Sequence, residues 1–388
     1  MPRHPEIAPE IARMAGGVFS TVAHRIAGLQ GEVYPLHVGD SYLEPPPGCR
    51  YQDLADAPAG WHRYGPPGGL PELIAAIAER REVGPERVLI APGATGVLSS
   101  VLGAILEPGD EVLLLSPYWP LIPGLVHTRG GCPVDVPWFA RELVGEAPDA
   151  EGLEVALGER LTQRTVAVYL NTPNNPTGRC LRAEEAEAIV RFARRHGLWI
   201  LADDVYEDHV WGHPHIALRA LAPERTFSVH SFSKSYAMAG TRVGYLLAPE
   251  QPGLLSQIHK VHMHSAYSAP IGPQHLALRA LQTGEAWRRA TTAEYRISGA
   301  AAAAALGVPE PEGGTFLFLD VAAKLDERGM QGLLEDCIDR NVLVAPGASC
   351  GRHFAGHIRL CFTAAPPQVT ARGVARLAAL LSGDRYLS

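Results

Sequence analysis

The chain has 388 residues, of which 46% are hydrophobic and 19% are charged, as is typical of a well-packed globular protein. The formal net charge of -7 offers no basic surface to nucleic acid, and no uncharged apolar run is long enough to span a bilayer. The first six residues lack the apolar core of a signal peptide, and six scattered cysteines without a CxxC pair favour free thiols in a reducing compartment. We therefore expect a soluble, cytoplasmic protein without a membrane or nucleic-acid partner.

Short apolar strands alternate with helices along most of the chain. Residues 7–30 predict one or two helices broken at Gly16-Gly17, and Pro71 suits the first position of a helix that continues to residue 81. The other expected helices are residues 97–106 and 183–196, and the expected strands are residues 33–38, 88–91, 111–116, 166–170, 199–202, 226–229 and 243–247. This alternation implies a mostly parallel sheet covered by helices on both faces.

The pattern changes near residue 285. A long Ala-rich helix is expected over residues 285–306, followed by a strand at 315–321, a helix at 330–340 and a strand at 358–362. This tail predicts a second, smaller α+β domain. We expect residues 51–284 to form the large domain, residues 285–388 the small one, and residues 1–50 a segment that packs with the small domain.

One lysine, Lys234, follows an expected strand and stands among small hydroxyl residues, with Ser231 and Ser233 before it and Arg242 after it. Burial would disfavour its charged form and lower its pKa. A lysine in this setting is a candidate for Schiff-base chemistry. The alternative for a lone lysine is an exposed position on a loop.

Polar residues also follow three other expected strands, where ligands of open α/β sheets bind. Gly93, Ala94 and Thr95 begin a helix, whose free N–H groups favour a phosphate, although an ordinary tight turn is an equal alternative. The loop at 171–178 holds Asn175 between prolines and is otherwise turn chemistry. Asp203 would need a cationic partner if buried, such as a protonated ring nitrogen, unless it only caps a helix.

Taken in order, these motifs resemble the pyridoxal-phosphate-dependent aminotransferases of fold type I, class I/II, from about Val33 to Phe362. The resemblance implies a large domain with a mostly parallel seven-stranded sheet between helices and a smaller α+β domain. It implies pyridoxal 5'-phosphate as cofactor and Lys234, Asp203 and Tyr206 as catalytic residues. The implied cofactor-binding residues are Tyr64, Gly93, Ala94, Thr95, Trp119, Asn175, Asp203, Tyr206, Ser231, Ser233, Lys234 and Arg242, and the implied substrate-binding residues are Gly39, Asn175 and Arg359.

The resemblance also assigns a role to each residue. Lys234 would hold the cofactor as an internal aldimine and move the proton between Cα and C4′, while Asp203 would keep the ring nitrogen protonated. Asn175 and Tyr206 would bind the phenolate oxygen, and Trp119 would stack on the ring unless it is only a core aromatic. The phosphate would be bound by Ser231, Arg242 and the N–H groups of Ala94 and Thr95.

Two further residues concern the substrate and the assembly. Arg359 matches the arginine that binds the substrate α-carboxylate, and Gly39 belongs to the loop that closes over it. Tyr64 matches the tyrosine that reaches the phosphate of the neighbouring subunit, which implies a homodimer with its sites at the interface.

The implied activity is a ping-pong transfer of an amino group from an L-amino acid to a 2-oxo acid. A lyase or cyclase that works by β- or γ-elimination on the same scaffold is the alternative, and a non-catalytic regulator that senses the cofactor is a third. Residues 18–24, 120–123, 264–271 and 313–316 are expected to line the side-chain pocket and to favour a neutral, aromatic or unusual amino acid.

Two groups of histidines suggest a metal site at first sight. His209, His213 and His215 form one group, and His262 and His264 form the other. No cysteine or carboxylate has matching spacing, so we expect no metal. We expect Asp204 and Asp208, near the first group, to be solvated.

Overall fold

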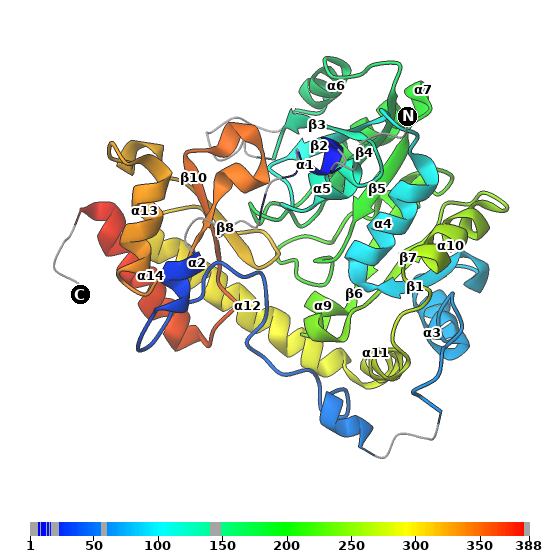
Figure 1. The fold of residues 1–388 in the computed structure, drawn as a ribbon, viewed down its shortest axis with the longest axis horizontal. Helices are drawn as coiled ribbons and strands as arrows, with labels where there is room; N and C mark the ends of the chain where they lie inside the picture. The colour runs from blue at the N-terminus through cyan, green and yellow to red at the C-terminus, as the bar shows by residue number, and fades with distance from the viewer. Residues whose placement is uncertain are drawn as a thin grey trace.

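The computed structural model describes residues 23–55, 60–139 and 149–383, with Ile7, Pro9–Ala12, Met14 and Gly16 from the N-terminal stretch. Its larger sheet has the strand order β1-β7-β6-β5-β4-β2-β3 (Figure 1). The strands are β1 (Val88–Pro92), β2 (Glu111–Ser116), β3 (Cys132–Pro137), β4 (Thr165–Asn171), β5 (Trp199–Asp203), β6 (Thr226–Ser231) and β7 (Val243–Leu247). Only β7 runs against the others, because it pairs antiparallel with both β1 and β6. The predicted seven-stranded, mostly parallel sheet is confirmed.

Helices cover both faces of this sheet because its strands are apolar on both sides. On β2, Leu113 and Leu115 belong to a core shared with α6 (Ala150–Gly158) and α7 (Ala183–His196). Val112 and Leu114 point to the opposite face, as the two-residue period of a strand requires, and share a core with α4 (Gly93–Ile105) and α10 (Leu254–Ser265). The sheet is therefore the middle layer of three.

Two further long helices cover one end of this sheet. At the β1–β7 end, α3 (Pro71–Arg81) and α11 (Ile271–Thr283) pack on the sheet. The short helices are α1 (Pro9–Ala12), α2 (Ala23–Ala27), α5 (Ile122–His127), α8 (Leu218–Leu221) and α9 (Phe232–Ser235). No helix in the described part of the chain combines the length and the apolar character needed to cross a membrane.

A second, antiparallel sheet has the order β8-β10-β9, formed by β8 (Phe316–Asp320), β10 (His357–Cys361) and β9 (Ala345–Pro346). It packs with α12 (Glu285–Leu306), α13 (Gly329–Ile338) and α14 (Pro367–Ser382) in a separate core. Figure 1 shows α12 in yellow, running from α11 beside the large sheet to α14. One long helix thus connects the two sheets.

The strand predicted for residues 33–38 is wrong. Within this stretch only Tyr34 forms a bridge, to Val342, and turns follow it. Pro35 has no N–H group, which prevents a continuous ladder. The stretch still lies against the smaller sheet, since Leu36 accepts a hydrogen bond from Cys361 N–H at 2.6 Å. The domain boundaries given above stay a prediction.

The strand β3 was not predicted. It carries Pro133 and Pro137, residues that interrupt a strand pattern in the sequence. Because β3 is the edge strand of the sheet, it pairs only with β2, and its prolines need not donate to a second neighbour. The sequence alone does not indicate that this segment lies at an edge.

The register of the central strands places the polar residues beside one another. Asn171 at the end of β4 pairs with Asp203 at the end of β5, and Asp203 pairs with Val229 on β6. Two residues after Val229, β6 ends at Ser231 and α9 begins. The carboxyl ends of three parallel strands therefore meet at one place.

Candidate active site

A cavity of about 220 Å³ lies at the carboxyl ends of β4, β5 and β6. All predicted site residues except Gly93 and Tyr64 line it. The lining consists of Gly39, Ala94, Thr95, Leu98, Trp119, Asn171, Asn175, Asp203, Val205, Tyr206, Ser231, Ser233, Lys234, Ala239, Arg242, Phe316 and Arg359. Residues far apart in the sequence, from the loop before Ser41 to strand β10, are thus brought together.

Asp203 is a buried carboxylate, with only 3% of its surface exposed. Its Oδ2 accepts a hydrogen bond from the Tyr169 hydroxyl at 2.7 Å, whereas its Oδ1 has no partner among the described residues. Burial raises the pKa of Asp203 to about 7, although the Tyr169 hydrogen bond acts in the opposite direction. A positively charged group in the cavity would complete this environment.

Lys234 lies on the one-turn helix α9, which starts at the end of β6. The Ser231 side chain caps this helix by accepting a hydrogen bond from the Ser233 N–H at 3.1 Å. The Lys234 ammonium donates to the carbonyl oxygen of Gly39. Burial lowers the pKa of Lys234, and the charges of Arg359 and Arg242 act in the same direction, while Asp40 opposes them. A lysine in this environment has an increased neutral fraction, which can act as a nucleophile or a base.

An anion site forms where the first turn of α4 faces α9. The N-terminal residues of α4, among them Ala94 and Thr95, line the cavity together with the hydroxyl groups of Ser231 and Ser233. Arg242 adopts a left-handed backbone conformation, with φ of +56°, and its guanidinium lies beside Gly93. A Cβ at position 93 would lie 2.4 Å from Arg242 Nη2. Glycine at this position therefore leaves the space that the guanidinium occupies.

A second cation, Arg359, lies on β10 and is 8% exposed. Its Nη1 donates to Asn175 Oδ1 at 3.0 Å and its Nη2 to the carbonyl oxygen of His37 at 3.0 Å, while its Nε has no partner among the described residues. The guanidinium carbon lies 4.5 Å from the centre of the Phe316 ring. The same ring leaves no room for a Cβ at Gly39, which would lie 2.5 Å from it.

The sequence did not single out Tyr169 or Asn171 as site residues, whereas Phe316 was among the expected pocket residues. Asn171 donates to the carbonyl oxygen of Asp203 at 2.7 Å and accepts from the N–H group of Asn175 at the same distance, so it joins two parts of the site. Tyr169 and Asn171 are two residues apart on β4 and therefore point to one face. That spacing is a signal visible in the sequence, but the pairing with β5 is not.

Other predicted pocket residues lie elsewhere or outside the described part. Among residues 120–123, 264–271 and 313–316, only Phe316 lines the cavity. Residues 18–22 lie outside the described residues. Tyr64 is 87% exposed and contacts Tyr267 edge to face at 4.9 Å between ring centres.

The histidines of the first group do not meet. His209 is buried beside Lys234, whereas His215 pairs with Asp204 at 3.2 Å. The expectation that Asp204 and Asp208 are solvated is wrong. Asp204 is 1% exposed and accepts from the Ser228 hydroxyl at 2.5 Å, and Asp208 accepts from Arg288 at 2.6 Å.

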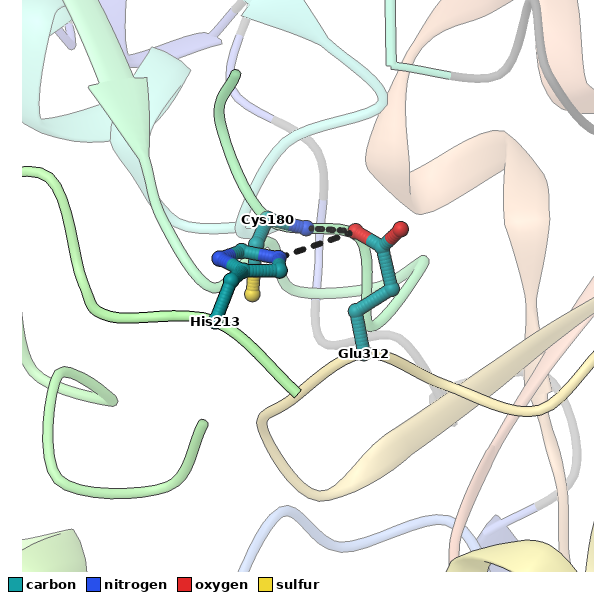
Figure 2. A group of neighbouring side chains, drawn as sticks. All are labelled: Cys180, His213 and Glu312. Carbon is teal, nitrogen blue, oxygen red and sulfur yellow. Dashed lines mark hydrogen bonds and ion pairs between the residues drawn. The ribbon is translucent and has the colours of Figure 1, made fainter. Parts of the chain in front are cut away.

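The third histidine, His213, meets Cys180 and Glu312 (Figure 2), and their possible ligand atoms lie within 4.8 Å of one another. The Glu312 carboxylate already accepts from the Cys180 N–H group at 2.7 Å and from the Arg182 guanidinium. Arg182 Nη1 also lies 3.3 Å from His213 Nε2. The Arg182 guanidinium therefore supplies the positive charge next to Glu312 and His213. The hydrogen bonds of Glu312 to Cys180 and Arg182 connect the loop after Gly178 to the segment that carries Glu312. The absence of a metal site stays a prediction.

Comparisons with known proteins point to one family. The model of the family "Aminotransferase class I and II" matches residues 33–377. The aspartate/prephenate aminotransferase of Thermus thermophilus is 34% identical over 319 residues, which cover 78% of this chain and 79% of that protein. An aspartate aminotransferase of Streptomyces avermitilis is 32% identical over 83% of this chain and 82% of its own. The solved structure of the aspartate aminotransferase from Thermus thermophilus with maleate has a TM-score of 0.84 and 29% identity, over 97% of this chain and 100% of that one.

The cavity fits pyridoxal phosphate, the cofactor of class I and II aminotransferases. The partnerless oxygen of Asp203 suits a protonated ring nitrogen, and the α4 N-terminus with Arg242 suits a phosphate. Lys234 lines the same cavity and would reach the aldehyde. The fit therefore rests on unsatisfied buried groups as well as on the motifs.

The buried Asp203 predicts a pH-dependent stability for the cofactor-free protein. Its pKa is about 7 in the folded state. The unfolded value is near 3.9, so the folded state retains a proton that the unfolded state loses. The contribution of Asp203 to stability should therefore fall as the pH rises from about 4 to about 7, by up to about 4 kcal/mol. Urea unfolding of the cofactor-free protein and of Asp203→Asn across this range should give a difference in stability that changes with this slope.

The same titration with saturating pyridoxal phosphate is the control, because a cationic ring nitrogen would keep Asp203 ionised. Equal slopes in the unmodified protein and Asp203→Asn would contradict the assignment.

The close approach of β7 to the α4 N-terminus predicts a second outcome. A Cβ at Gly244 would lie 2.6 Å from both Ala94 N and Gly93 C. Gly244→Ala should displace the first turn of α4 and weaken pyridoxal phosphate binding at least about tenfold. The dissociation constant comes from absorbance titration of the cofactor-free protein. Gly240→Ala is the matched control, since nothing lies within 4 Å of its Cβ, and it should bind within about twofold of the unmodified protein. Equal losses in both variants would rule out this role of the glycine.

Proposed function

Because the chain belongs to the pyridoxal-phosphate-dependent aminotransferases of class I and II, we propose that it transfers the amino group of an L-amino acid to a 2-oxo acid in two alternating half-reactions. The observation that carries this proposal is the convergence of Lys234, Asp203 and Arg359 on one cavity. They supply a base of lowered pKa, a buried anion and a cation for a carboxylate.

Pyridoxal phosphate, when bound, supplies the aldehyde that takes up the amino group and a ring that accepts electrons from Cα. Asp203 would hold the proton on the ring nitrogen and so keep the ring electron-poor. Asn175 and Tyr206 would hydrogen-bond to the phenolate oxygen, and Trp119 would lie against the ring. Ser231, Ser233, Arg242 and the first turn of α4 would bind the phosphate, and Gly93 makes room for Arg242.

Lys234 moves the proton. Its lowered pKa favours the neutral amine, which takes the proton from the substrate Cα and returns it at C4′. Arg359 binds the α-carboxylate through its two-pronged guanidinium, with Asn175 beside it, so that the Cα–H bond faces Lys234. Gly39 allows its loop to approach Phe316 and Lys234 closely.

The aromatic lining argues for a donor with a neutral or aromatic side chain. Trp119, Tyr206 and Phe316 line the cavity, and the cations among its described residues, Lys234, Arg242 and Arg359, already have roles. The relatives named above include aspartate and aspartate/prephenate aminotransferases, so L-aspartate and L-glutamate belong in any comparison.

The experiment is a visible spectrum of the holoprotein while L-amino acids are added one at a time. The proposal predicts that a yellow protein bleaches with its donor and recovers its colour with a 2-oxo acid. Lys234→Ala should bind the cofactor yet turn over about 10³-fold more slowly or worse. Lys260→Ala, an exposed lysine on α10, is the matched control and should leave turnover unchanged.

Each result decides between the functions. If the colour persists while ammonia and a 2-oxo acid accumulate, the protein catalyses elimination and the proposal of transamination is wrong. A protein that binds cofactor but reacts with no amino acid would favour the non-catalytic sensor.

We also propose that the protein works as a homodimer, in which Tyr64 reaches the phosphate of the neighbouring site. Tyr64 does not line the cavity of its own chain, and it is 87% exposed beside Tyr267, which is 44% exposed. Exposed aromatic side chains of this kind are typical of interfaces.

We propose that residues 51–284 form the large domain and residues 285–388 the small one, with residues 1–50 packed on the small domain. We also propose that the protein works in the cytoplasm, where its six cysteines stay reduced.

Complementation tests this dimer. Lys234→Ala and Tyr64→Ala chains are each impaired alone, but a mixed dimer contains one site with both residues intact. Random mixing should therefore restore about a quarter of the normal activity, because about half of the dimers are mixed. No gain above the Tyr64→Ala protein would mean that Tyr64 does not act across an interface.

A further inference from the structure

His209 is fully buried beside the reactive lysine, and the functions above give it no role. Its Nε2 lies 3.0 Å from the carbonyl oxygen of Lys234, and its Nδ1 lies 3.1 Å from the Thr292 hydroxyl oxygen. A carbonyl oxygen can only accept, so Nε2 carries the hydrogen and donates it to Lys234. Burial lowers the pKa of His209, which keeps the ring neutral and makes Nδ1 an acceptor. The single hydroxyl hydrogen of Thr292 is shared between this Nδ1, at 3.1 Å, and the carbonyl oxygen of Asp208, also at 3.1 Å.

The backbone of His209 is fixed on both sides. Its N–H group donates to the carbonyl oxygen of Tyr206 at 2.8 Å, and its carbonyl oxygen accepts from Gly314 at 2.8 Å. A side chain at Gly313 would collide with this carbonyl, at 2.5 Å. The ring therefore projects from a rigid turn that also carries Tyr206, another residue of the cavity.

Helix α12 holds the other side of the ring. Thr292 and Tyr295 lie three residues apart on one face of α12, and the Tyr295 ring centre is 5.1 Å from that of His209. The Tyr295 hydroxyl in turn donates to Ser41, two residues after Gly39. Gly39 in turn accepts from the Lys234 ammonium. Lys234 is therefore held at its backbone by His209 and at its side chain by Gly39, and Tyr295 contacts both His209 and Ser41, near Gly39.

We propose that His209 is a positioning residue for Lys234, which holds the backbone carbonyl of the lysine and so fixes the direction in which its side chain enters the cavity. This inference rests on the proposed function, because it assigns the reactive amine to Lys234. His209 itself reaches the cavity only through Lys234. Its effect should therefore appear in every step that depends on the placement of the lysine amine, and little in substrate binding by Arg359.

The test compares His209→Leu, which removes the donor, with His209→Gln, whose amide N–H can replace Nε2–H. The first readout is the rate constant at which the cofactor-free protein captures added pyridoxal phosphate, followed by absorbance without any amino acid. The second is kcat and KM for the best donor. Thr292→Val keeps the ring but removes its Nδ1 partner, together with the hydrogen bond to the Asp208 carbonyl oxygen. His196→Leu, at the exposed end of α7, is the matched control.

The proposal predicts that His209→Leu lowers both the capture rate constant and kcat about tenfold, with KM changed by less than about twofold. His209→Gln should recover to within about threefold of the unmodified protein, Thr292→Val should lie between the two, and His196→Leu should change neither quantity.

Unchanged capture and kcat in His209→Leu, or a loss in His209→Gln as large as in His209→Leu, would overturn the positioning role. If the unmodified protein captures no cofactor at all, the proposed function fails together with this inference. A normal capture by the unmodified protein with no effect at position 209 removes the inference alone.

Discussion

The site depends on one buried negative charge. Asp203 lies at the end of the central strand β5, is almost fully enclosed, and keeps one carboxylate oxygen without a partner among the described residues. Leaving a carboxylate in this state is unfavourable, so the folded chain either protonates it or binds a cation next to it. The protein thus carries a built-in preference for a ligand with a positively charged ring.

The other charges of the cavity are arranged around this anion. The α4 N-terminus and Arg242 form one positive region, and Arg359 on the smaller sheet forms a second. A ligand with a cationic ring nitrogen, a phosphate and a carboxylate could place one group at each of these three charges. Lys234 lines the same cavity, so orientation and reactivity are set by the same fold.

Much of this arrangement could be predicted from the sequence because it depends on local patterns. Short apolar strands followed by Asp203, by the 171–178 loop or by Lys234 indicate a parallel sheet with polar residues at its carboxyl edge, and the ends of β2, α7, β7 and α12 were predicted to the residue. The order of the motifs then indicated the family that the comparisons confirm.

What could not be predicted depends on contacts between distant segments. The hydrogen bond from Tyr169 to Asp203 requires the register of β4 on β5, and His209 meets Lys234 and Thr292 only after the turn at Tyr206 and α12 have packed together. The bridge from Tyr34 to Val342 and the pairing of the proline-containing strand β3 likewise form only when distant segments come together in the sheets. Sequence periodicity does not report such pairings.

The central claim is that Lys234 forms the covalent link to the cofactor. The most direct measurement is reduction of the holoprotein with borohydride, followed by proteolysis and mass spectrometry. The chain has three lysines, Lys234, Lys260 and Lys324, so the assignment is unambiguous. The account predicts a phosphopyridoxyl group on the peptide that contains Lys234 and on neither of the others. A modification at Lys260 or Lys324, or none in a protein saturated with pyridoxal phosphate, would contradict it.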